Sequence, residues 1–100
     1  MRKLPIKTAT IVLEGDYEGW ELVCRTNPPM SMLQELASGD FKTLMATLPK
    51  LIISWNFVDE EGEYIGDPSE VTIAKLPTEL IMGVLNKITD KISSAPSPNF

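Results

Sequence analysis

The first quarter of the chain alternates apolar and polar positions on both sides of a glycine-containing turn. Residues 8–14 are rich in β-branched side chains, residues 15–19 supply turn chemistry, and residues 20–26 resume the alternation. A period of two is typical of half-buried strands. The positions of the second run that share one face are Trp20, Leu22 and Cys24. The pattern therefore predicts an N-terminal β-hairpin with Cys24 facing a core.

Two short helical segments follow the hairpin. Asn27 precedes two prolines, which is typical of a helix entry, and Gly39 can end a helix over residues 30–38. Asp40 then offers a second N-cap. The apolar residues after it recur at i, i+3, i+4 and i+7, at Phe41, Leu44, Met45 and Leu48. We therefore predict two short central helices, the second with one apolar stripe.

Residues 50–57 fit two patterns. The helical stripe continues to Ile52 and Trp55 if the helix kinks at Pro49, whereas every second residue from Leu51 is also apolar, as in a strand. We favour the strand, because β-branched and aromatic residues dominate the segment. The acidic turn at residues 59–62 then leads into residues 63–65, which predicts a second hairpin.

The last periodic segment predicts an amphipathic helix. Residues 66–69 have loop composition, and Pro77 is favoured in a first helical turn. The apolar stripe that follows consists of Leu80, Ile81, Val84, Leu85, Ile88 and Ile92. Residues 93–100 lack periodicity and contain two prolines, which predicts a flexible tail. The chain is thus expected to form one small α+β domain over residues 1–92.

Composition narrows the classes of partner. The chain has 100 residues, of which 43% are hydrophobic and 23% charged, as in ordinary globular proteins. Its net charge is -5 and its basic residues are scattered, so nucleic acid and membrane surfaces are poor partners. A lone cysteine fits a reducing compartment. The apolar run at residues 9–13 is far shorter than a signal-peptide core, and no segment reaches the ~20 apolar residues of a membrane span.

Residues suited to catalysis are scarce. The chain contains no histidine, so it lacks the commonest general base and metal ligand, and no glycine-rich phosphate loop is present. The acidic residues between positions 59 and 70 do not have the spacing of a calcium-binding loop. Cys24 is interpreted as a buried structural thiol, because no basic cluster is present to activate it. We expect no enzyme, cofactor or metal site; lysine and carboxylate chemistry is the least favoured alternative.

Four aromatic side chains flank the two predicted hairpins and are the candidates for partner binding. Such side chains anchor either a hydrophobic core or a protein interface. For Trp20 and Trp55 core packing is the favoured interpretation. For Phe57 and Tyr64, beside the acidic turn, the two roles are evenly balanced.

Residues 48–88 carry a further pattern. It combines the pair Trp55-Asn56, the acid-glycine turn at residues 59–62, a short polar spacer, and Leu76-Pro77 at the start of an apolar terminal helix. In these features, and in a hairpin ahead of short helices, the chain resembles the small tail assembly chaperones of long-tailed, siphovirus-type bacteriophages.

The resemblance implies a stoichiometric chaperone without turnover. Such proteins bind the long tape measure protein in the host cytoplasm and keep it soluble until tail-tube subunits polymerise around it. The tail tube protein and self-association are further expected contacts. Many members also have a longer form made by ribosomal frameshifting. The predicted flexible tail at residues 93–100 would suit such an extension. The alternatives are a structural tail-completion or connector protein of the virion, and a small acidic protein-binding module unrelated to phage.

Overall fold

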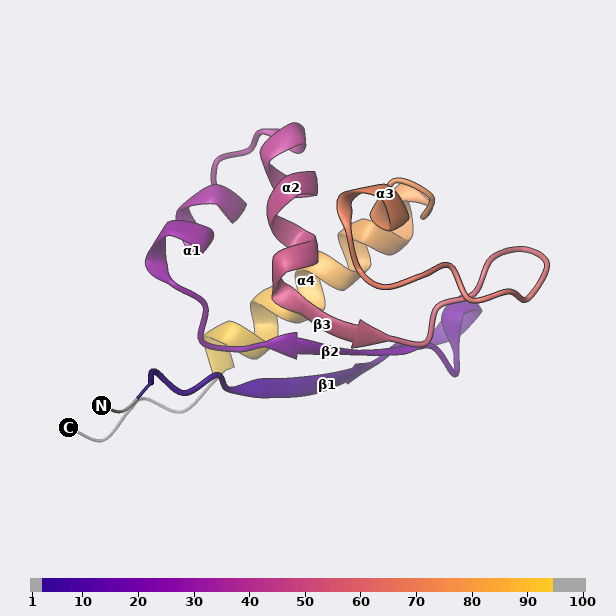
Figure 1. The fold of residues 1–100 in the computed structure, drawn as a ribbon, viewed down its shortest axis with the longest axis horizontal. Coiled ribbons are helices and arrows are strands. Elements are labelled where there is room, and N and C mark those ends of the chain that lie inside the picture. The colour runs from indigo at the N-terminus through magenta and orange to yellow at the C-terminus, as the bar shows by residue number, and fades with distance from the viewer. Residues whose placement is uncertain (1–2, 95–100) are drawn as a thin grey trace.

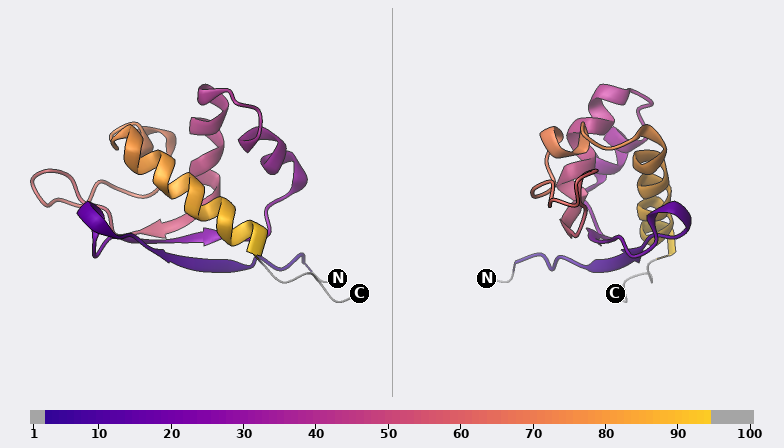
Figure 2. Two further views of the ribbon diagram at one scale, coloured as in Figure 1. Left: turned by 180° about the vertical axis from the view of Figure 1, so that it is seen from behind. Right: turned by 90° about the vertical axis from the view of Figure 1, so that its right-hand side faces the viewer.

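A computed structural model describes residues 3–94 and confirms the α+β class. Three antiparallel strands in the order β1-β2-β3 form a sheet, and the helices lie on one of its faces (Figure 1). The view from behind shows α4 crossing that face along its length (Figure 2). Among the described residues, no helix has the length and apolar content needed to cross a membrane.

The N-terminal hairpin is confirmed. Strands β1 (Thr8–Val12) and β2 (Glu21–Arg25) pair with Ile11 opposite Leu22, and the 3-10 helix η1 (Gly15–Tyr17) forms the connection. Ile11 and Leu22 are buried, and Cys24 is fully buried, as predicted. Alternation along β2 therefore directs one row of side chains into the core beneath the helices.

The central helices α1 (Met30–Leu36) and α2 (Phe41–Leu51) are both present. Asp40 caps α2, since its carboxylate accepts hydrogen bonds from the Lys42 N–H at 3.2 Å and the Thr43 hydroxyl at 2.7 Å. Asn27 does not cap α1. Its side chain instead accepts from the Lys7 N–H at 2.9 Å and donates to the Pro5 carbonyl at 2.9 Å, so it holds the N-terminal arm.

Helix and strand meet directly within the ambiguous segment. Helix α2 continues through Pro49 to Leu51, and β3 (Ile52–Trp55) begins at the next residue. The favoured strand is therefore correct for residues 52–55 only, because residues 50 and 51 are helical and residues 56 and 57 follow the end of β3. The β2–β3 ladder is irregular between Val23 and Cys24, which alters the alternation of burial along β3.

The second hairpin is present in a reduced form. A single bridge joins Val58 to Tyr64, and no further strand follows it in the described chain. The turn between them is closed by a hydrogen bond from the Gly62 N–H to the Asp59 carbonyl at 3.0 Å. Gly62 has φ +82, a conformation that side-chain-bearing residues rarely adopt.

The chain then forms one helix that the sequence analysis missed and one that it predicted. The short α3 (Glu70–Ile73) starts at a capping box between Ser69 and Thr72. The amphipathic α4 (Thr78–Ser94) extends two residues beyond the predicted end at residue 92. The rest of the predicted tail, residues 95–100, lies outside the described residues. The largest fully buried apolar side chains at the centre of the core are Leu22, Leu48, Leu51, Phe57, Ile73 and Ile88.

Candidate functional site

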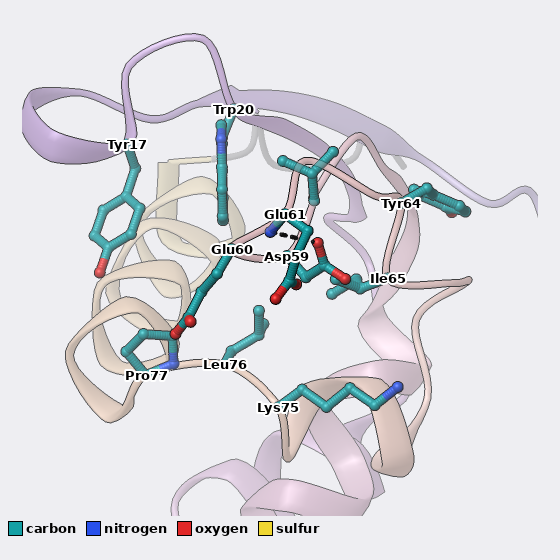
Figure 3. Close-up of a pocket in the computed structure, with 11 residues that line it drawn as sticks. Tyr17, Trp20, Asp59, Glu60, Glu61, Tyr64, Ile65, Lys75, Leu76 and Pro77 are labelled. Carbon is teal, nitrogen blue, oxygen red and sulfur yellow. Dashed lines mark hydrogen bonds between the residues drawn. The ribbon is translucent and has the colours of Figure 1, made fainter.

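A groove of about 500 Å³ lies at the end of the molecule where the hairpin turn meets the acidic loop (Figure 3). Its lining comes from three places in the sequence: the turn before β2, the loop at residues 58–65, and the connection between α3 and α4. The apolar lining consists of Tyr17, Trp20, Val58, Tyr64, Ile65, Leu76 and Pro77. The groove thus exists only in the folded chain.

A row of packed aromatic rings connects the groove residues Tyr17 and Trp20 to the core. Trp20 packs on Phe57 with ring centroids 5.0 Å apart, and Phe57 stacks on Trp55 at 4.7 Å with an interplanar angle of 18°. Tyr17 packs on the other side of Trp20 at 5.5 Å. Trp55 and Phe57 are buried, whereas Trp20 is half-buried. Trp20 is therefore an aromatic surface held rigidly by the core.

The four predicted contact residues separate into two pairs. Trp55 is 7% exposed and Phe57 is 0% exposed, so both belong to the core and a partner could not touch Phe57 in this conformation. Core packing, the favoured interpretation for Trp55, holds for both residues, so neither is a direct contact site in this conformation. Trp20 and Tyr64 both line the groove, and Tyr64 is 51% exposed. Figure 3 shows Tyr64 at the opposite end of the groove from Tyr17.

Carboxylates form one wall of the groove. Among the described lining residues, Asp59, Glu60 and Glu61 are acidic and Lys75 is basic, so this wall carries net negative charge. Asp59 orders the loop, because its carboxylate accepts hydrogen bonds from the N–H groups of Glu61 at 2.9 Å and Glu63 at 3.0 Å. The exposed side chains of Glu60 and Glu61 are left to face solvent and the groove (Figure 3).

Two tyrosine hydroxyls donate hydrogen bonds to carboxylates near the groove. The Tyr17 hydroxyl donates to Glu79 at 2.7 Å and ties the hairpin turn to the start of α4. The Tyr64 hydroxyl donates to Asp67 at 2.9 Å. Each hydrogen bond raises the pKa of its tyrosine, because ionisation would remove the donated proton and place a second negative charge beside the carboxylate.

Asn56 and Trp55 tie the end of β3 to segments next to the groove lining. The Asn56 side chain accepts from the Glu21 N–H at 2.8 Å and donates to the Gly19 carbonyl at 3.1 Å, so it joins the end of β3 to the hairpin turn. The Trp55 indole N–H donates to the Gly66 carbonyl at 2.7 Å. The Trp55-Asn56 pair of the sequence pattern is thus a structural clamp that links β3 to the hairpin turn and to Gly66.

Tyr17 is the aromatic groove residue that the sequence analysis missed. It lies in the predicted turn at residues 15–19, where composition points to a connection and not to a binding surface. The turn that follows η1 brings the two rings together, because the Trp20 N–H donates to the Tyr17 carbonyl at 3.0 Å.

The groove combines aromatic, aliphatic, acidic and basic side chains. Within residues 3–94, no group of three or more cysteine, aspartate, glutamate or histidine side chains is arranged to hold a metal ion. Cys24 is buried beneath the sheet face, and burial raises the pKa of its thiol. No protein-family model, curated protein or solved structure matches the chain. The fold and the groove define a small α+β domain with an aromatic and acidic surface groove.

Proposed function

We propose that the chain is a protein-binding module that acts as a phage tail assembly chaperone. In this proposal the groove takes a bulky apolar side chain from an amphipathic helix of the tape measure protein, with a neighbouring lysine or arginine facing the acidic wall. The chain binds stoichiometrically, in the host cytoplasm, and dissociates as the tail tube forms. The choice of partner comes from the resemblance of residues 48–88 to tail assembly chaperones.

The observation that supports this function best is the position of Trp20 beside the acidic loop. Half-buried aromatic side chains on a rigid support are typical anchors of protein interfaces. Glu60 and Glu61 lie next to this anchor and favour a positively charged neighbour on the partner. A tape measure helix exposes apolar side chains that would otherwise aggregate, and an apolar groove with a charged rim can cover them reversibly.

The test is binding to the tape measure protein encoded in the same genome, measured with purified components or by co-expression. Trp20→Ala should weaken binding by about 30-fold, the loss expected for an interface anchor of about 2 kcal/mol. Glu60→Lys should weaken it several-fold at low salt, and the difference should shrink as salt screens the rim. Glu70→Lys is the matched control, because Glu70 is exposed and lies outside the groove lining.

Two results would count against the proposal. If all three variants fold, as judged by circular dichroism, and bind equally strongly, the groove is not the contact site. Stoichiometric copies of the chain in purified particles would instead support a structural tail-completion or connector protein, because an assembly chaperone should be depleted from the mature virion.

A further inference from the structure

The outer edge of β1 offers unpaired backbone groups. The Leu13 N–H donates to the Trp20 carbonyl at 2.9 Å, and the Thr26 N–H donates to the Lys7 carbonyl at 2.8 Å. The backbone N–H and C=O groups of the odd-numbered residues in this strand therefore point toward β2. Backbone groups alternate in direction along an antiparallel strand. Thr8, Thr10 and Val12 therefore direct their N–H and C=O groups away from the sheet, and the turn and loop hydrogen bonds of residues 3–94 do not use them.

This edge lacks the features that usually prevent strand association. Charged residues, prolines and bulges protect exposed edges. The strand Thr8–Val12 has the sequence TATIV, which contains none of these residues and has high β propensity. The irregularity of the sheet lies in the other ladder, between β2 and β3.

Helix α4 places charges beside the same edge. A cavity of about 370 Å³ lies between the two elements, lined by residues 10–12 of β1 and by Lys87, Asp90 and Lys91 of α4. The first turns of α4 lie beside Leu13 instead, so α4 runs antiparallel to β1 and its last turns lie toward the middle and start of the strand (Figure 2).

We propose that β1 pairs antiparallel with β1 of a second copy of this chain, about a two-fold axis through Thr10. In this register Thr8 lies opposite the partner's Val12, and the outward N–H and C=O groups of both strands bond to each other. The result is one continuous sheet of six strands. The side chains of Thr8, Thr10 and Val12 are exposed and alternate with the buried Ile11, so the pairing requires no change in the core.

Charge complementarity favours a second copy over an unrelated strand. An interface with two-fold symmetry brings the same patch of both chains together, so a patch with adjacent opposite charges complements itself. Asp90 and Lys91 are adjacent and exposed, and both line the cavity beside Thr10 together with the half-buried Lys87. Across the axis each Asp90 faces the partner's Lys91, twice in one dimer. These two contacts offset part of the repulsion between chains that each carry a net charge of -5.

The first test is sedimentation velocity across a range of concentrations, from low micromolar to several hundred micromolar. The natural chain should form dimers. Asp90→Lys should weaken dimerisation by about tenfold, because it replaces two modest ion pairs with two repulsive contacts. The exchanged variant Asp90→Lys/Lys91→Asp should restore it. A chain that stays monomeric throughout, or an exchanged variant as weak as Asp90→Lys, would overturn the proposed interface.

The second test is amide hydrogen exchange, read residue by residue. The amides of Ala9 and Ile11 should be protected at every concentration, whereas those of Thr8, Thr10 and Val12 should become protected only as the dimer forms. Thr10→Pro removes an outward N–H and leaves the bonds to β2 intact, so it should give a folded monomer. Dimers in which the even-numbered amides exchange freely would refute strand pairing. Protection that appears only with a different protein would assign the edge to that protein.

Discussion

Replacing Asn56 with alanine should lower stability and disturb the groove together. The substitution removes the hydrogen bond from the Glu21 N–H and the one to the Gly19 carbonyl. Each of these hydrogen bonds contributes about 0.5–1.5 kcal/mol to the free energy of unfolding. Because Asn56 is exposed and water competes for both bonds, we expect a total loss of about 1–2 kcal/mol. For a domain of this size the midpoint of thermal unfolding should fall by roughly 5–15 °C.

Thermal unfolding followed by circular dichroism measures this loss, and near-ultraviolet spectra report the packing of Trp20 and Trp55. Asn56→Asp is the matched control, because a carboxylate still accepts from the Glu21 N–H but cannot donate to the Gly19 carbonyl. Its midpoint should lie between those of the natural chain and Asn56→Ala. An Asn56→Ala midpoint within one or two degrees of the natural chain, with unchanged tryptophan spectra, would refute the clamp.

Three further predictions follow from burial and hydrogen bonding. Phe57→Ala should cost about 3–5 kcal/mol in urea unfolding, because it empties a fully buried site between two indole rings, whereas Tyr64→Ala should leave the midpoint nearly unchanged. The Cys24 thiol should react with a disulfide reagent slowly in the native chain and rapidly in urea. Asp40→Ala should lower the thermal midpoint by a few degrees at neutral pH.

The pH dependence of these effects has a definite sign. Hydrogen bonds from Thr43 and the Lys42 N–H lower the pKa of Asp40, so its stabilisation is present above the ordinary value of 3.8 and is lost as the pH falls through the folded pKa. The natural chain and Asp40→Ala should therefore converge in strong acid. Burial raises the pKa of Cys24, so stability from the neutral thiol declines as the pH rises above its ordinary value of 9.0. Equal pH profiles for Asp40→Ala and the natural chain would contradict the first assignment.

The sequence predicted the elements that have a long, regular period. The hairpin and α4 each repeat their pattern over several residues. Both are confirmed, the hairpin as β1 (Thr8–Val12) paired with β2 (Glu21–Arg25) and the helix as α4 (Thr78–Ser94). Helix α3 was missed because four residues do not complete two helical turns. Residues 50–57 carried two patterns at once because α2 ends and β3 begins without a connecting loop.

The groove was harder to predict than the elements around it. Its residues come from separate segments, and only tertiary packing brings Tyr17 and Trp20 to the acidic loop. An aromatic residue in a strand-like segment has the same pattern whether it faces the core or a partner. The sequence therefore identified Trp20, Trp55, Phe57 and Tyr64 as a set, and burial then separated the core pair from the surface pair.

The groove and the β1 edge occupy different parts of the hairpin, so the two proposed contacts can form together. A two-fold axis through Thr10 places one groove beyond the Leu13 end of each strand. Three residues of strand cover about 10 Å, so the two grooves would be at least ~20 Å apart on opposite ends of the six-stranded sheet.

A long helical partner with repeated apolar sites would then be held at two points, and its second site would bind at a high effective concentration. Asp90→Lys should therefore weaken binding to a long tape measure fragment much more than binding to a peptide with one site. Equal losses for both ligands would show that dimerisation and partner binding are not linked in this way.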